Sequence, residues 1–528
     1  MCELRRTGSG RLNRLRRLAP AAATAAALTA LARGAAVSAR GGGGGHGGGG
    51  GHSSGHSGSF GGFHGGGFHG GYPGGGTLFF ANLGTALVTI VIVVLVIYLV
   101  FLMRRSGRAA VAGGAARGFE TFEPQAPEAS PAALRQAEIA LDEIRAADPD
   151  FEAETFLQRA EMTFFLVSRA FGHVDEKAAR PYFTPAAFEV WKRDVDGFAA
   201  AQVRPILDDL NVRGMHVVSA SHAADGDEIV VHFDLVYRFR TVSAATGTQQ
   251  QDEGEDRRRG QRWTFRREAG VKTLVEGGVV AQKCPQCGAP LELGADGRCR
   301  YCRADICAGA FDWTVAGIVA ADFEGVRPEP LFGATRLEPA AGFAAIRSAD
   351  PQFDGAQFVQ RVGVAFVALQ QAWATRDLDV GRGFMSPGLY YGWSAQIETM
   401  AEERRRNAIE NVQIHAIAPV AVVHGRAFDD VTVRIDASCV DYEIDETTGR
   451  LVFGSRDAEP FVEFWTFQRS TDAKTPEHGL LDKRCPNCGA PLDVNAVGQC
   501  TYCKAAVTSG RFDWVLSRIE QEEEVAYG

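Results

Sequence analysis

Helix-spaced apolar residues followed by strand-like alternation fill the chain from residue 131 onward. The first helix is expected over 131–147, where Pro131 follows the N-cap residue Ser130 and apolar residues repeat every three or four positions. A longer and strongly apolar helix is expected after an Asp-Pro turn, with apolar positions at Phe156, Ala160, Met162, Phe164, Val167 and Phe171. A matching helix is expected later, with apolar positions at Phe358, Val362, Phe366, Leu369 and Trp373.

An antiparallel series of strands is expected after each pair of helices. The expected strands are 216–218, 229–240, 263–267, 412–423, 431–442 and 461–469. Residues 251–260 are rich in charge and are expected to form a hairpin loop. Because helices precede strands in each half, the predicted fold class is α+β.

The strand expected at 229–240 has one apolar and one polar face. Val231, Phe233 and Leu235 alternate with His232 and Asp234. Since the apolar residues of such a strand pack on the core, we expect His232 and Asp234 to face solvent, and Asp436, the counterpart of Asp234, to do the same.

The same order of motifs occurs twice, about 200 residues apart. Residues 147–151 recur at 349–353, and the Trp-Thr-Phe of 263–265 recurs at 465–467, both with an offset of 202. A Ser/Thr-Pro pair followed by tryptophan recurs with the same offset, and the cysteine sets described below recur with an offset of 201. This near-constant offset indicates a tandem duplication of one domain.

The aspartates of the repeated Asp-Pro motif are expected to have a local role. Asp148 and Asp350 each stand at the turn between the two helices of their copy. An aspartate at such a place is typical of a turn or of a helix N-terminus, so we expect one of these roles for both.

An uncharged run of 26 residues, Leu78 to Met103, predicts a transmembrane helix. Four arginines follow it: Arg104, Arg105, Arg108 and Arg117. The positive-inside rule therefore places residues 104–528 in the cytosol of a cell whose inner membrane holds the protein. Residues 1–39 resemble a cleaved secretory signal, and an uncleaved anchor there would give the same orientation.

Glycine is concentrated in one segment, where 22 of the 36 residues from 41 to 76 are glycine. This segment is expected to be disordered and external, and it contains His46, His52, His56, His64 and His69. Two interpretations stay open for these histidines: a solvated spacer, or a tract that binds metal ions loosely. The remaining 489 residues after position 39 carry a net charge of −15, so nucleic acid is not an expected partner.

Two sets of four cysteines carry the clearest chemistry. Their members are Cys284, Cys287, Cys299 and Cys302, then Cys485, Cys488, Cys500 and Cys503. Both sets have the spacing of two Cys-x-x-Cys turns separated by eleven residues, which predicts two structural metal ribbons, with zinc favoured over iron. A disulfide framework is the alternative, and a cytosolic location argues against it. Four thiolates leave no open coordination position, so no catalytic role is expected for the metal. Cys2 belongs to the leader, and Cys307 and Cys439 are expected to be packing thiols.

The Asp-Pro-x-Phe motif, the closing Trp-Thr-Phe and the ribbons of the form CPxCGAPL…CxYC resemble the Tim44-like domain family in its bacterial inner-membrane form. The resemblance implies two tandem domains similar to the nuclear-transport-factor-2-like cone, each a curved sheet around an apolar pocket. It also implies membrane tethering, lipid contact or protein handling without catalysis. The chain differs from the mitochondrial import protein because it has a predicted span, two copies and no long basic N-terminal region.

These inferences combine into one domain assignment. The expected parts are a signal peptide (1–39), a Gly/His-rich external segment (40–77), a transmembrane helix (78–103), a basic linker (104–130), two Tim44-like domains (131–275 and 342–470), two zinc ribbons (281–313 and 482–514) and an acidic tail (515–528).

The expected function is that of a non-catalytic membrane tether or scaffold. Its expected partners are membrane lipids and a protein or peptide, and its oligomeric state stays open. One alternative is a metal-responsive protein that uses the Gly/His tract. Another is an enzyme with His232 and Asp234 as acid and base, although His232 aligns with Arg434, which a shared catalytic role does not predict.

Overall fold

The computed structural model describes residues 131–521, apart from 255–256, 275–277, 295, 308, 325–333, 477–479 and 496. The expectations for the leader, the Gly/His segment, the span and the linker lie outside the described residues. Among the residues that are described, no helix is both long enough and apolar enough to cross a membrane.

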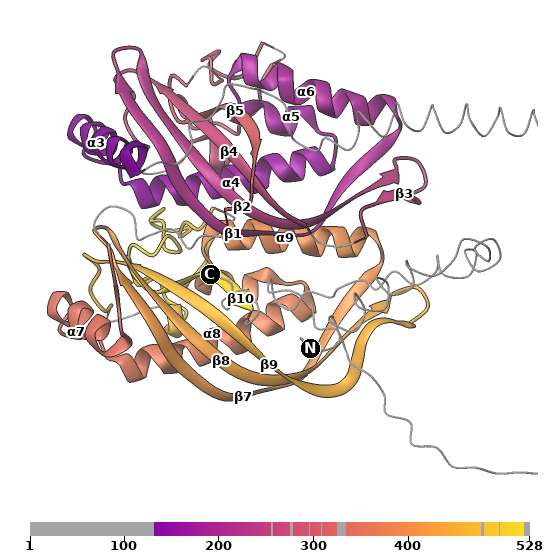
Figure 1. The fold of residues 1–528 in the computed structure, drawn as a ribbon, viewed down its shortest axis with the longest axis vertical. Coiled ribbons are helices and arrows are strands. Elements are labelled where there is room, and N and C mark those ends of the chain that lie inside the picture. Colours follow the sequence, from indigo (N-terminus) through magenta and orange to yellow (C-terminus); the bar gives the residue numbers. More distant parts are fainter. Residues whose placement is uncertain are drawn as a thin grey trace, which may run out of the picture. The chain divides into compact units, whose positions relative to one another are not determined.

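The first copy begins with helices that pack on one face of a sheet (Figure 1). These helices are α3 (Pro131–Ala147), α4 (Ala153–Gly172), α5 (Glu176–Ala179) and α6 (Pro185–Ala200). The two predicted helices are confirmed as α3 and α4. Helix α6 is not among the helices predicted from the sequence. Its N-cap residue is Thr184, whose Oγ1 accepts a hydrogen bond from the backbone N–H of Ala187 at 3.4 Å.

The sheet of the first copy is antiparallel, with the strand order β1-β2-β4-β5 and with β3 paired to β2. Its strands are β1 (Val203–Ala223), β2 (Gly226–Ser243), β3 (Gln249–Asp252), β4 (Arg257–Glu268) and β5 (Thr314–Ala321). The three predicted strands lie within β1, β2 and β4. The hairpin loop expected at 251–260 is shorter, because β3 and β4 take residues from both of its ends.

The second copy repeats this architecture. Its elements are β6 (Thr335–Leu337), α7 (Pro339–Ala349), α8 (Gly355–Thr375), α9 (Pro387–Glu402), β7 (Arg405–His424), β8 (Phe428–Asp445), β9 (Leu451–Ser470) and β10 (Val515–Gln521). The strand order is β10-β9-β8-β7-β6. Helix α9 has the place in the second copy that α6 has in the first, and Ser386 caps it as Thr184 caps α6.

In each copy the last long strand comes after the cysteine ribbon. β5 pairs with β4, and β10 pairs with β9, so each ribbon is an excursion between two neighbouring strands of one sheet. The sequence analysis begins the acidic tail at 515, whereas the structure has residues 515–521 in β10.

Aromatic rings fill the space between the long helix and the sheet in each copy. The ring of Phe164 on α4 lies 5.1 Å from that of Phe233 and 5.4 Å from that of Trp263, measured between centroids. In the second copy Phe366 lies 5.0 Å from Trp465. The family resemblance implies an apolar pocket inside the curved sheet. In the structure these buried rings occupy that place and form the core.

Of the two roles expected for Asp148 and Asp350, the turn is confirmed and the helix cap is wrong. The backbone N–H of Phe151 donates to the carbonyl of Asp148 at 2.9 Å, and that of Phe353 donates to the carbonyl of Asp350 at 2.9 Å. The N-cap residues of α4 and α8 are Glu152 and Asp354. Asp148 is instead buried and accepts hydrogen bonds from Arg267 at 2.7 Å and from the backbone of Thr273 at 2.8 Å. Its carboxylate therefore ties the turn after α3 to the end of β4.

The same arrangement is present in the second copy. Asp350 accepts hydrogen bonds from Arg469 at 2.9 Å and from the backbone of Thr475 at 3.0 Å. Burial works to raise the pKa of Asp148 and Asp350, but hydrogen bonds from the threonine and the arginine outweigh it and hold both pKa values below the usual range.

Candidate metal centres

Tight backbone turns bring the cysteines of each ribbon together. In the first ribbon the N–H of Gly288 donates to the carbonyl of Cys284 at 2.8 Å, and Gly288 has a φ of +71°. A left-handed conformation of this kind favours glycine, which explains the glycine after the second cysteine. The N–H of Arg303 closes the other turn on the carbonyl of Cys299 at 2.9 Å.

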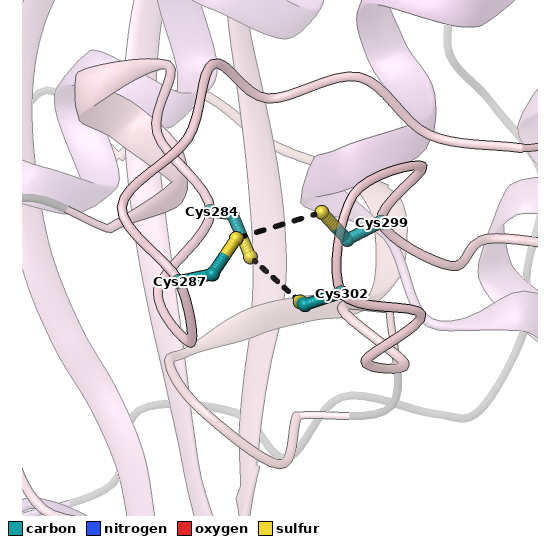
Figure 2. Close-up of side chains that lie close together, drawn as sticks. All are labelled: Cys284, Cys287, Cys299 and Cys302. Carbon is teal, nitrogen blue, oxygen red and sulfur yellow. Dashed lines mark hydrogen bonds between the residues drawn. The ribbon is translucent and has the colours of Figure 1, made fainter.

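The four sulfur atoms of the first ribbon face one another across a small gap (Figure 2). Sγ of Cys284 lies 3.7 Å from Sγ of Cys302, and Sγ of Cys287 lies 4.0 Å from Sγ of Cys299. All four sulfurs lie within 4.8 Å of one another. A tetrahedral metal with bonds of about 2.3 Å requires sulfurs about 3.8 Å apart, so this arrangement fits one metal ion.

The second ribbon repeats this geometry. Sγ of Cys485 lies 3.7 Å from Sγ of Cys503, and the cluster is completed by Cys488 and Cys500 within the same 4.8 Å limit. The side-chain amide of Asn487 donates to Sγ of Cys503 at 3.4 Å. Burial works to raise the pKa of Cys503, but this hydrogen bond and others outweigh it and lower the pKa to about 6, which favours the thiolate that binds metals. The structure thus brings together all eight predicted ligands as two groups that could each hold a metal ion.

Each ribbon is fastened to its own domain by an ion pair from the long helix. Arg159 of α4 pairs with Asp312 at 2.5 Å, and Arg361 of α8 pairs with Asp513 at 2.9 Å. These aspartates belong to the repeated Phe-Asp-Trp motif that follows each ribbon. The motif therefore links the ribbon to the helix just before the last strand begins.

The two remaining described cysteines are buried. Cys307 donates a weak hydrogen bond from its Sγ to the carbonyl of Arg180 at 3.4 Å, and burial raises its pKa to about 11. Cys439 lies in the core of the second domain. Both positions agree with the expected packing role.

The expectation that His232 and Asp234 face solvent is wrong. Their alternation with apolar residues is as predicted, but His232 is 0 % exposed and Asp234 only 3 %. Residues that follow β5 cover this side of the sheet, and the backbone N–H of Glu324 donates to Asp234 at 2.9 Å. The counterpart of Asp234 in the second copy, Asp436, forms an ion pair with Arg434. Its side chain is 29 % exposed.

Two residues that the sequence analysis does not single out complete this polar cluster. His216 Nε2 lies 3.1 Å from a carboxylate oxygen of Glu324, whose other oxygen lies 3.5 Å from His232 Nδ1. Burial and the neighbouring His232 lower the pKa of His216. The register that sets His216 opposite His232 across β1 and β2 is the only signal that could have identified it.

Comparison with known proteins gives limited further detail. No curated protein matches the chain. Among solved structures, the chain is similar to an Ntf2-like protein involved in plasmid conjugation, with 10 % identity and a TM-score of 0.12 over 58 % of this chain and 93 % of that chain. A similarity at this level supports no statement about function.

The comparison with family models identifies the family of the chain. The model of the Tim44-like domain matches residues 137–275 and 339–484, which together are more than half of the 528 residues. The two matches coincide with the two copies of the repeat, and the four-cysteine clusters lie at or beyond the end of each match. The chain therefore belongs to the Tim44-like domain family, of which it contains two tandem domains.

Proposed function

We propose that the protein is a non-catalytic tether of the bacterial inner membrane whose two cytosolic Tim44-like domains bind a partner protein, peptide or lipid. The observation that carries this proposal is the tandem Tim44-like pair placed after an uncharged run of 26 residues. The family membership supports a membrane-associated scaffold or binding role, and the run supplies a segment long enough to anchor it.

The burial of the polar cluster supports a non-catalytic role. His232, the best acid or base candidate of the sequence, is 0 % exposed and lies beneath the segment that contains Glu324. A general acid or base must come within hydrogen-bond reach of a substrate. The cluster therefore serves the packing of this segment on the sheet.

The tether is tested with the full-length chain and with a variant that lacks residues 78–103. Full-length protein is expected in the membrane fraction and to resist extraction by carbonate, whereas the variant is expected in the soluble fraction. A variant that lacks residues 41–76 but keeps the run is the control, and it should stay with the membrane. Retention of the 78–103 deletion in carbonate-washed membranes would contradict anchoring by this run.

We also propose that each cysteine cluster holds a structural zinc ion. The sulfur separations of 3.7 to 4.0 Å suit a tetrahedral zinc site, and four thiolates occupy every coordination position. When bound, the metal would contribute directly to the folding of a ribbon that has little core of its own.

Metal analysis of the purified full-length protein tests the zinc sites. We expect about two zinc ions per chain, and one for either Cys287→Ser or Cys488→Ser. The matched control is Cys307→Ser, which removes a buried thiol that is not a ligand and should leave two ions. Iron in place of zinc would contradict the metal identity, and a chain without metal would contradict both centres.

A further inference from the structure

Helices α4 and α8 present matching faces in different surroundings. The α4 face consists of Gln158, Glu161, Met162, Phe165 and Arg169. The α8 face consists of their counterparts 202 residues later: Gln360, Gly363, Val364, Val367 and Gln371. Because neighbouring members are one, three or four residues apart, each set forms one stripe along its helix.

The α4 face is covered by α9 of the second domain. A Cβ added at Gly388 would lie 2.0 Å from a carboxylate oxygen of Glu161, and a Cβ added at Gly392 would lie 2.9 Å from the ring of Phe165. The two helices therefore approach closely, and a side chain added at either position would displace Glu161 or Phe165.

The covered and the open face differ sharply in exposure. Met162 and Phe165 on the α4 face are each 5 % exposed, whereas their counterparts Val364 and Val367 on the α8 face are 46 % and 49 % exposed. The same apolar positions are thus buried in one copy and open in the other.

The exposed side of α8 carries no charge. The only charged residue in this helix of 21 residues is Arg361, which is buried and pairs with Asp513. The exposed residues are instead glutamine, alanine, valine and threonine. A helix that faces solvent normally carries charged residues there, and a lack of charge is typical of the centre of an interface.

The apolar surface continues from α8 onto the neighbouring strand β7. Val412, Ile414 and Ile417 are half-buried on this strand, and Val420 is exposed. In the first domain α9 reaches the equivalent strand as well, because Gln396 donates to the backbone carbonyl of Leu210 at 3.2 Å. A stable interface buries about 800 Å² on each partner, so we place the contact on the strand as well as on the helix.

A head-to-tail array of chains does not fit the α8 face. In such an array α6 of the next chain would lie on α8, as α9 lies on α4. However, α6 has Arg193 where α9 has Ala395. This arginine would become buried without a counterion on the uncharged face.

A two-fold arrangement fits the α8 face. Across a two-fold axis each side chain meets its own copy or a symmetric partner, so a charge near the axis would face its like. The face has no charge, and the side-chain amides of Gln360 and Gln371 can both donate and accept, so each can pair with its copy. At Gly363 a Cβ would lie 3.5 Å from Cδ1 of Ile417, so this side of the helix packs against β7 of its own domain.

We propose that the α8 face is the contact surface between two copies of this chain, packed about a two-fold axis. The centre of the contact is the pair Val364 and Val367, with the glutamines at its ends and the apolar residues of β7 at its side. This assignment goes beyond the proposed tether function and does not depend on it.

The test uses full-length chains that carry two different affinity tags and are expressed together. Purification through one tag should recover the other chain. Val367→Glu in both chains should lower this recovery by at least about ten-fold, because two carboxylates would meet at the axis. Val367→Glu in one chain with Val367→Lys in the other should restore it. Arg193→Glu on α6 is the control and should leave recovery unchanged.

Every other outcome overturns the proposal. Failure to recover the second wild-type chain means that the copies do not associate. Recovery that is unaffected by Val367→Glu means that they associate through another surface. Failure of the Glu/Lys combination to restore recovery means that position 367 does not meet its own copy, and that another protein or a different geometry covers α8. Unchanged metal content of each variant shows that the chain is folded.

Discussion

In the first domain the long helix α4 is buried under α9, whereas in the second domain α8 exposes the counterpart residues to solvent. The interiors of the two domains do not differ in this way. Arg267 pairs with Asp148 at 2.7 Å in one, and Arg469 pairs with Asp350 at 2.9 Å in the other. The duplication has therefore kept the internal framework of the domain and changed its outer surfaces.

This contrast shows how a duplicated domain acquires separate tasks. In a head-to-tail pair such as this one, a helix of one copy covers the long helix of the other, so the equivalent face of the second copy is left uncovered. The close contact with α4 is made at Gly388 and Gly392 of α9, whereas α6 has Ala186 and Val190 at the same positions. The uncovered face on α8 carries no charge, whereas its counterpart on α4 carries Glu161 and Arg169.

The largest expected effect concerns the shared interior. Asp350→Ala should lower the free energy of unfolding of the second domain by about 3–5 kcal/mol, because it leaves Arg469 buried without its carboxylate. Asp148→Ala should cost less, since Arg267 keeps a second partner, Asp227, at 2.8 Å. Denaturant unfolding followed by tryptophan fluorescence measures both. The exposed Asp150→Ala is the control, and equal losses for the two variants would contradict the role of Asp227.

The next effect compares the covered and the open helix face. Phe165→Ala should cost about 3–4 kcal/mol, because it opens a cavity between α4 and α9. Val367→Ala at the counterpart position should change stability by less than about 0.5 kcal/mol in dilute protein, since this side chain is half exposed. The pair is measured by thermal unfolding at low protein concentration. A large loss for Val367→Ala in the monomeric protein would mean that α8 is covered within the chain.

The smallest effect concerns the carboxyl group that α4 has and α8 lacks. Burial raises the pKa of Glu161 to about 7, against the opposing effect of Arg518. A carboxyl whose pKa is raised on folding stabilises the protein fully below its unfolded pKa near 4.5, and this stability is lost as the pH rises through the folded pKa of about 7. Glu161→Gln should therefore raise the melting temperature by a few degrees at pH 8 and leave it unchanged at pH 4.5.

The measured quantity is the difference in melting temperature between the Glu161→Gln variant and the parent protein at each pH. Asp430, whose pKa burial raises to about 6, titrates in the same range in both proteins. The difference between the two pH profiles therefore isolates Glu161. Equal melting temperatures of variant and parent at pH 8 would contradict the raised pKa.

The regular elements of each domain could be predicted because their patterns are local. The spacing of Phe156, Phe164 and Phe171 is sufficient for α4, and the alternation around Phe233 is sufficient for β2. The cysteine clusters could be predicted for the same reason, since two residues between cysteines make a metal-binding turn wherever the turn lies.

What could not be predicted depends on contacts between distant parts of the chain. The partner of Asp148 is Arg267, 119 residues later, and nothing local distinguishes this buried carboxylate from a turn residue. His232 is buried because Glu324, just after β5, lies over this side of the sheet, and the pattern of β2 identifies only which side His232 faces. The strands β5 and β10 are separated from the rest of their sheets by the ribbons, so they look like flanking sequence.

Because each ribbon lies between two paired strands, loss of a metal from the ribbon would also affect the sheet. A chain whose second ribbon lacked the proposed metal would lose the fold that brings β10 back to β9. The backbone groups of residues 463–468 that face β10 would then lose their partners, while β8 still pairs with the other side of β9. These residues read Glu-Phe-Trp-Thr-Phe-Gln, an aromatic strand with one charge whose exposed edge can template pairing with another chain. If the clusters hold the proposed metal, they protect the chain from aggregation as well as stabilise each ribbon, and removal of the metal would first cause loss of solubility.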